Sequence, residues 1–97
     1  MQLKQVTLVF KKNDFFSISQ NPSMDEININ YSAPTNNSTV QVNIYDINGR
    51  AIYYNKSDLS GTTNFYKKID ISNFQTGIYI VEVLNGEKRY KEKTIKL

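Results

Sequence analysis

Residues 76–97, TGIYIVEVLNGEKRYKEKTIKL, contain an apolar and largely β-branched run, an Asn-Gly pair and a strongly basic last segment. Apolar residues recur in the run with a period of two, which is the period of a β-strand, and Asn-Gly between two extended segments is typical of a tight hairpin. The strand is apolar on its second face as well, through Ile78, Ile80 and Leu84. We therefore expect this run to lie in the middle of a sheet, with the basic segment paired to it as an antiparallel strand.

The same period of two extends over almost the whole chain, and no window shows the spacing of an amphipathic helix. An all-β fold is therefore expected, with short strands separated by turn clusters as in a β-sandwich or barrel. Residues 1–14 are a linker, the end of a preceding domain or an added first strand, and residues 15–97 form the domain. The expected strands span residues 3–10, 15–19, 26–31, 39–45, 51–55, 64–69, 78–84 and 88–96.

The alternation separates a buried face of each strand from an exposed one. Neighbours of the apolar positions are mostly polar, so most strands should have one face in solvent. The core is expected to contain Ile27, Ile29, Tyr31, Val40, Val42, Ile44, Phe65, Ile69, Ile71, Tyr79, Val81 and Val83.

Two Asn-Gly pairs stand between extended runs, Asn48-Gly49 and Asn85-Gly86. Asn and Gly accept the positive φ values that both central positions of a type I′ turn require. Each pair therefore predicts a two-residue antiparallel hairpin.

The segment DISNFQTGIY, residues 70–79, leads into the apolar run. Ile71 and Phe74 are spaced to fill a turn against the core, and Gly77 allows a close approach of the backbone. Tyr79 then enters the strand facing inward, which is the layout of a tyrosine corner, where the hydroxyl bonds to the backbone a few residues upstream. The alternative is a core aromatic whose hydroxyl only reaches the rim of the core. In both cases Tyr79 is structural.

The composition argues against catalysis, because the 97 residues include no Cys and no His. The absence of these two residue types excludes disulfide scaffolds, most zinc sites, cysteine nucleophiles and Ser-His triads. We therefore expect no enzyme, no metal site and no cofactor. No stretch approaches the ~20 consecutive apolar residues of a transmembrane helix, so no membrane span is expected.

The net charge of +3 arises entirely in residues 86–97, which hold five basic and two acidic residues. A basic strand could bind nucleic acid. However, Glu87 and Glu92 partly cancel the positive charge of the segment, and a net charge of +3 would neutralise few phosphates. Lysine and glutamate on an edge strand also protect a sheet against edge-to-edge association. A nucleic-acid partner is therefore not expected.

Three blocks in this order resemble the type A C-terminal sorting domain of the type IX (Por) secretion system of Bacteroidota. They are FSISQNPSMDEININY at 16–31, VQVNIYDINGRAIYY at 40–54 and IDISNFQTGIYIVEVLNGEKRYKEKTIKL at 69–97. In that family an Asn-Pro precedes an extended strand, a V-x-I-Y-D-x-x-G-R hairpin, and a D-I-S-x-F-x-x-G-I-Y-I-V strand with a Lys-rich end. One departure is Gln20, where the family often has Pro. The matching positions are Asn21, Pro22, Val42, Ile44, Tyr45, Asp46, Gly49, Arg50, residues 70–81, Lys91, Lys93 and Lys96.

The resemblance implies an Ig-like antiparallel β-sandwich of seven to eight strands that is the last domain of a larger exported protein. Such a domain is a non-catalytic signal that directs an N-terminally attached cargo through the periplasm and across the outer membrane. Its partners would be the type IX outer-membrane translocon and shuttle components. In many members a cell-surface sortase removes the domain, and in others it stays attached. The protein would be secreted or held at the cell surface.

Expected translocon-recognition residues are Gly77, Lys91, Lys93, Ile95, Lys96 and Leu97. Expected structural turn and corner residues are Asn21, Pro22, Asn48, Gly49, Asn85, Gly86 and Tyr79. The alternative function is an Ig-like adhesion or carbohydrate-binding module of a surface protein, suggested by tyrosines that we expect to be exposed: Tyr45, Tyr54 and Tyr66.

Overall fold

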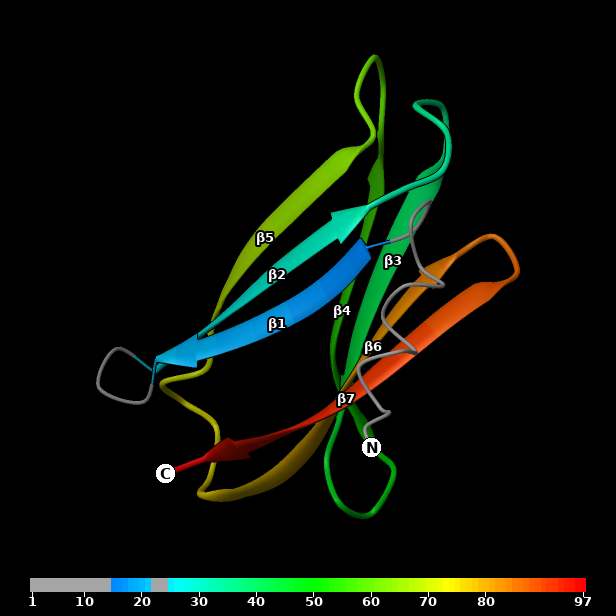
Figure 1. Ribbon diagram of the computed structural model, residues 1–97. Helices are drawn as coiled ribbons and strands as arrows, with labels where there is room; N and C mark the ends of the chain where they lie inside the picture. Colours follow the sequence, from blue (N-terminus) through cyan, green and yellow to red (C-terminus); the bar gives the residue numbers. More distant parts are fainter. Residues whose placement is uncertain (1–14, 22–24) are drawn as a thin grey trace, which may run out of the picture.

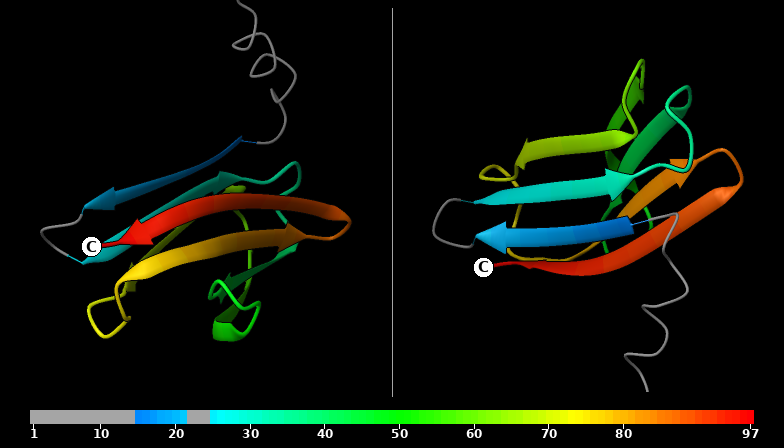
Figure 2. Two further views of the ribbon diagram at one scale, coloured as in Figure 1. Left: turned by 90° about the horizontal axis from the view of Figure 1, so that it is seen from below. Right: turned by 45° about the horizontal axis from the view of Figure 1, so that its top comes forward.

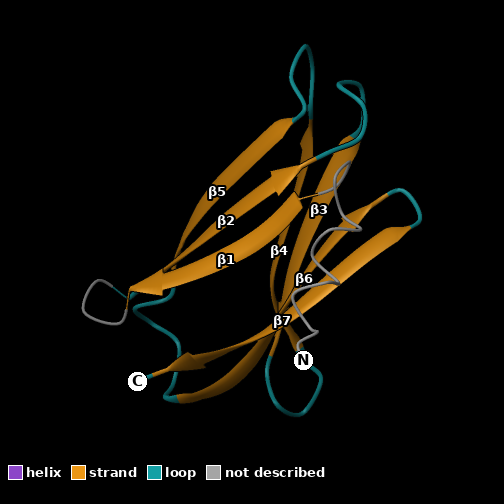
Figure 3. Cartoon of the chain, in the orientation of Figure 1, coloured by secondary structure: helices purple, strands orange, loops and turns teal. Residues whose placement is uncertain are grey.

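The computed structural model describes residues 15–21 and 25–97, and this part of the chain contains seven β-strands (Figures 1 and 3). All seven strands expected within residues 15–96 are present, and their ends differ from the expected ones by at most three residues. The strand expected at residues 3–10 lies outside the described residues. The strands are β1 (Phe15–Asn21), β2 (Glu26–Ser32), β3 (Thr39–Tyr45), β4 (Ala51–Asp58), β5 (Asn64–Asp70), β6 (Gly77–Asn85) and β7 (Lys88–Lys96).

The strands form two antiparallel sheets, one with the order β1-β2-β5 and the other with the order β4-β3-β6-β7. The two sheets lie face to face as a sandwich (Figure 2). β6 lies between β3 and β7, so the prediction that the apolar run is an interior strand is confirmed. β7 is an edge strand of its sheet, and β1 of the other sheet lies along it.

The core fills the space between the two sheets. All twelve residues expected there are buried, with at most 7% of their surface exposed. Burying a Val, Leu, Ile or Phe side chain contributes about 1.5–3 kcal/mol, so this set supplies most of the driving force for folding. The sequence pattern missed Ala33 and Leu59, which follow β2 and β4 and are 4% and 8% exposed.

β3 and β4 form the predicted antiparallel hairpin, but the prediction of a type I′ turn between them was wrong. The Gly49 amide donates to the carbonyl oxygen of Asp46 at 3.0 Å, and the Asp46 amide donates to the carbonyl oxygen of Arg50 at 2.9 Å. Positive φ falls on Gly49 (85°) and not on Asn48. This is the three-residue loop in which a type I turn is followed by a left-handed glycine.

The β6–β7 turn is displaced by one residue from the predicted position. Asn85 pairs with Lys88, which leaves Gly86 and Glu87 as the turn, and positive φ falls on Gly86 (64°) alone, as in a type II′ turn. The reason lies in the Asn85 side chain, which is inside the protein. Its Oδ1 accepts a 2.8 Å hydrogen bond from the Tyr31 hydroxyl, and its Nδ2 donates to the Thr39 carbonyl oxygen at 2.9 Å. Asn85 therefore belongs to the strand and joins the two sheets.

Candidate functional site

β7 divides its side chains between two faces of the sheet. Thr94 and Lys96 face inward and are only 6% and 9% exposed. Tyr90 shares their face, and its ring stacks on that of Phe16 in β1 with centroids 5.5 Å apart. This set of side chains fastens the last strand to the opposite sheet. The opposite set, all exposed, consists of Arg89, Lys91, Lys93 and Ile95, and the exposed Leu97 follows the end of the strand.

Lys96 differs from the other expected recognition residues because its side chain forms an ion pair with Asp25. Its Nζ lies 3.1 Å from Asp25 Oδ1, and the Lys96 side chain is only 11% exposed. The carbonyl oxygen of Asp25 in turn accepts the amide of Ile71 at 2.9 Å, so the acid is held beside the end of β5. Lys96 therefore ties the end of β7 to the other sheet, whereas Lys91 and Lys93 are exposed on the outer face.

A buried carboxylate lies on the outer face of the four-stranded sheet. Glu82 in β6 is 5% exposed. Its Oε1 accepts hydrogen bonds from Asn43 Nδ2 at 3.1 Å and the Tyr45 hydroxyl at 2.8 Å, and Arg89 Nε lies 3.2 Å from Oε2. The sequence reasoning missed this network, although one acid inside an otherwise apolar run was a signal for it.

The network also sets the charge state of its members. Burial acts to raise the pKa of Glu82, but hydrogen bonds from Asn43 and Tyr45 and the nearby charges of Arg89 and Lys91 outweigh it and hold that pKa below its ordinary value. The hydrogen bond to Glu82 raises the pKa of Tyr45. At neutral pH the carboxylate is therefore ionised and holds the Tyr45 ring against the sheet.

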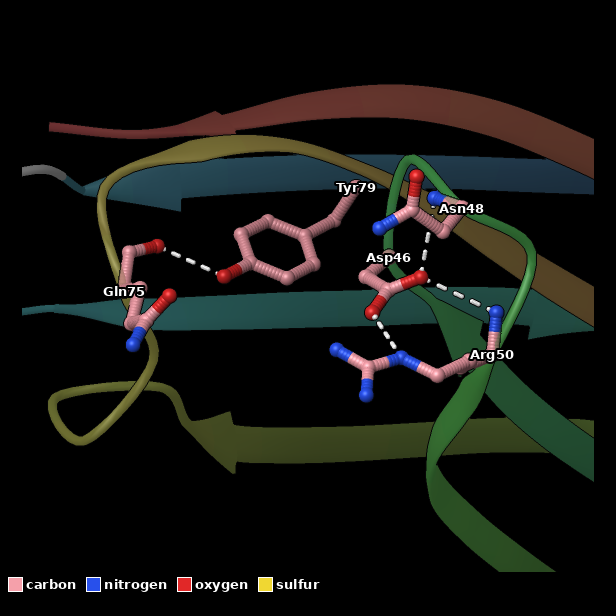
Figure 4. Close-up of polar contacts among 5 residues, drawn as sticks. All are labelled: Asp46, Asn48, Arg50, Gln75 and Tyr79. Carbon is pink, nitrogen blue, oxygen red and sulfur yellow. Dashed lines mark hydrogen bonds and ion pairs between the residues drawn. The ribbon is translucent and has the colours of Figure 1, made fainter.

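The β3–β4 hairpin is fixed by the Asp46 side chain (Figure 4). Asp46 Oδ1 accepts the amides of Asn48 and Arg50, both at 2.9 Å, and Oδ2 accepts Arg50 Nε at 2.9 Å. The backbone hydrogen bond from Arg50, more than any other contact, lowers the pKa of Asp46. The carboxylate therefore organises its own loop, and this loop carries Ile47, which is 71% exposed.

The corner before β6 has the hydrogen bond expected of a tyrosine corner. The Tyr79 hydroxyl donates to the carbonyl oxygen of Gln75 at 2.6 Å (Figure 4), and the Phe74 ring lies 5.1 Å from the Tyr79 ring. The close approach expected at Gly77 is absent, because nothing lies within 4 Å of the position that a Cβ would take. The glycine is explained by its φ of 152° instead.

Two hollows meet where the hairpin and the corner come together at one end of the sandwich. One, of about 500 Å³, lies between the hairpin and residues 73–79. The other, of about 430 Å³, lies on the outer face of β6, between the hairpin and Lys91. Both are bordered by Ile47 and Ile78. This end of the molecule therefore combines exposed apolar side chains with concave surface.

Most of the expected recognition residues lie together on β6 and β7. In the register of the two strands Ile78 pairs with Ile95, Ile80 with Lys93, and Gly77 with Lys96. Leu97 follows the end of β7 and is 70% exposed. Of the Asn-Pro loop, Asn21 ends β1 and pairs with Glu26, while Pro22 lies outside the described residues.

The tyrosines that suggested a carbohydrate-binding module do not form one surface. Tyr54 and Tyr66 are 61% and 57% exposed but belong to different sheets. The Tyr45 hydroxyl is bonded to Glu82. Within residues 15–21 and 25–97 no three or more acidic side chains gather as a metal site would require. The same residues include no helix of the length and apolar character needed to span a membrane.

Comparison with known proteins gives a family match and several structural neighbours, of which two are described here. Residues 17–97 match the family described as secretion system C-terminal sorting domain. No protein among curated sequences matches the chain.

The first structural neighbour is dimeric latent PorU from Porphyromonas gingivalis, with a TM-score of 0.70 and 16% identity over 87% of this chain. The match spans only 9% of the PorU chain. The second is a DUF3244 family protein with an immunoglobulin-like β-sandwich fold from Bacteroides vulgatus, with a TM-score of 0.56 and 16% identity over 88% of this chain and 98% of that one. The fold is therefore an Ig-like β-sandwich, as expected. The chain belongs to the secretion system C-terminal sorting domain family, whose members are sorting signals of the type IX secretion system.

Proposed function

We propose that this chain directs an attached cargo protein across the outer membrane, and that translocon and shuttle components of the type IX system bind it through its last hairpin. The observation that carries the proposal is the family match over residues 17–97. A chain that carries this signal is part of a secreted or cell-surface protein. The route to that destination would pass through the periplasm.

The recognition residues in this proposal are those of the last hairpin that combine exposure with a common face. Lys91, Lys93 and Ile95 fulfil both conditions, and the exposed Leu97 follows the end of β7. Gly77 contributes by its backbone conformation at the start of β6. Lys96 is left out of the recognition set, because its side chain is largely buried and its ion pair with Asp25 gives it a structural role.

The chain acts in this proposal without catalysis. The 97 residues include neither Cys nor His, so they cannot form a Cys-His or Ser-His pair. Release of the cargo would be the work of a separate cell-surface sortase. Neither the family match nor the structural neighbours point to an adhesion or carbohydrate-binding module.

The test is an export assay in a cell that has a working type IX system. The 97-residue chain is fused to the C-terminus of a folded reporter that also carries a signal for export to the periplasm. The reporter is expected in the medium or on the cell surface, and in the periplasm when the translocon is deleted. A reporter that stays in the periplasm of the competent cell would refute the proposed function.

A further inference from the structure

We propose that the outer face of β6 and β7, together with the tip of the β3–β4 hairpin, is a docking surface for a protein segment that carries apolar side chains alongside carboxylates. The proposal rests on the proposed function and deepens it, because it names the surface and the chemistry of the partner. We call this surface the isoleucine face. Its members are Ile47, Ile78, Ile80, Lys91, Lys93 and Ile95.

The apolar part of the isoleucine face is formed by neighbouring side chains from distant positions in the sequence. Ile78 and Ile95 are opposite each other in the register of β6 and β7, and they are 37% and 49% exposed. Ile47, at the tip of the hairpin, is 71% exposed. Large apolar side chains that gather on one exposed face are typical of surfaces that bind another protein.

The isoleucine face is also concave. The hollow of about 430 Å³ is bordered by Ile78 and Ile80 from β6, Ile47 from the hairpin and Lys91 from β7. Its volume falls within the range of about 300–1,000 Å³ that is common for binding pockets. It can therefore receive apolar side chains of a partner next to a positive charge.

The charges around the hollow favour an acidic partner. The two acids that border it are each paired with an arginine, Glu82 with Arg89 at 3.2 Å and Asp46 with Arg50 at 2.9 Å. Lys91 and Lys93 add positive charge on the same side of β7 as Ile95. A partner that places carboxylates beside its apolar side chains matches both properties at once.

The borders of the hollow are held in place before any partner binds. Tyr45 is fixed by the 2.8 Å hydrogen bond that its hydroxyl donates to Glu82, and the hairpin is fixed by the hydrogen bonds that the amides of Asn48 and Arg50 donate to Asp46. A surface that is already ordered loses less conformational entropy on association, so its contacts contribute more fully to affinity.

The first experiment measures binding of short peptides to the full ¹⁵N-labelled chain by NMR. The probe is a six-residue peptide in which Asp and Ile alternate, and the controls replace Asp by Lys or Ile by Ser. Amide shifts are expected at Ile78, Ile80, Lys91, Lys93 and Ile95 with the Asp-Ile peptide, and at least tenfold weaker binding with either control. Equal binding of the Lys-Ile peptide, or shifts confined to the other sheet, would overturn the proposal. Binding to phosphatidylglycerol vesicles without binding to the peptide would also overturn it.

The second experiment tests the surface in the export assay. Ile78→Ser and Lys91→Glu are combined in one variant, and Tyr66→Ser and Lys68→Glu, on the exposed face of β5, form the matched control. Urea denaturation first selects variants that remain folded. Export of the reporter is expected to fall at least tenfold for the first variant and to stay unchanged for the control.

The outcomes separate this inference from the proposed function. If the unchanged chain fails to export the reporter, the proposed function is wrong, whatever the peptides show. If the unchanged chain exports and the folded isoleucine-face variant exports equally well, the docking surface is wrong while the proposed function stands.

Discussion

Lys96 Nζ lies 3.1 Å from Asp25 Oδ1, so the end of β7 is joined by an ion pair to the segment that begins β2. Replacing Lys96 by Met keeps the length of the side chain and removes its charge. We expect a loss of about 1 kcal/mol in the free energy of unfolding, because Asp25 is about one third exposed and partly solvated. Urea denaturation at pH 7 measures this loss.

The matched control is Lys93→Met, which changes an exposed lysine of the same strand and should alter stability by less than about 0.5 kcal/mol. The double variant of Lys96→Met with Asp25→Asn should lose less than the sum of the single variants, because each removes the same pair. Additive losses would show that the pair contributes nothing.

Asn85→Ala is expected to destabilise the protein by about 2–3 kcal/mol, because it removes two hydrogen bonds from a buried side chain and leaves their partners inside the protein. Asn48→Ala is the control, since Asn48 also precedes a glycine but is exposed, and it should cost less than about 0.5 kcal/mol. Thermal unfolding of both variants provides the measurement. Similar losses in the two would mean that Asn85 acts only through the turn.

Tyr79→Phe removes the hydroxyl that donates to Gln75 at 2.6 Å and leaves the ring in the core. We expect a loss of about 1 kcal/mol in the free energy of unfolding, the usual contribution of one such hydrogen bond. Tyr54→Phe, at a ring that is 61% exposed, serves as the reference and should be neutral. If Tyr79→Phe left the free energy of unfolding unchanged, Tyr79 would stabilise the protein through core packing alone.

The lowered pKa of Glu82 predicts how stability depends on pH. A carboxyl whose folded-state pKa lies below its unfolded value contributes stability above the unfolded pKa, and this contribution is lost as pH falls through the folded pKa. The free energy of unfolding should therefore decrease as pH falls below the ordinary value of 4.5. Because Asp46 and Asp70 also have lowered pKa values, Glu82→Gln should reduce this pH dependence without abolishing it.

Denaturant titrations between pH 7 and pH 2.5 on the wild type and Glu82→Gln give the comparison. Glu92→Gln, at an exposed position of β7, is the control and should follow the wild type. Identical pH profiles for the wild type and Glu82→Gln would exclude a stabilising role for the ionised carboxylate.

The strand boundaries and the core were predictable because both follow from neighbours along the chain. Whether Val42 or Gln41 faces inward depends only on the alternation within one strand, and the alternation in that strand was clear. The order of strands within each sheet was not predictable in this way. β3 pairs with β6 across the whole of β4 and β5, and no local pattern specifies that partner.

The position of the turn after β6 and several contacts of the site depend on residues that are distant in sequence, so local patterns did not predict them. The displaced turn after β6 depends on a hydrogen bond between Asn85 and Tyr31, which are 54 residues apart in sequence. The inward position of Lys96 could have been predicted from the sequence. Lys96 is an even number of residues from Tyr90 and Thr94 and so lies on their face of the strand, whereas Lys91 and Lys93 lie on the opposite face. The Lys-rich composition of the segment concealed this difference.

Because the side chains of β7 alternate between an inward and an outward set, the function of the strand constrains its length more strongly than the identity of its residues. Inserting or deleting one residue between the turn at Gly86 and Tyr90 would rotate every later side chain to the opposite face. Lys93 and Ile95 would then point toward the core, and Lys96 would move away from Asp25. Homologous chains should therefore tolerate substitutions in this strand more readily than changes in its length.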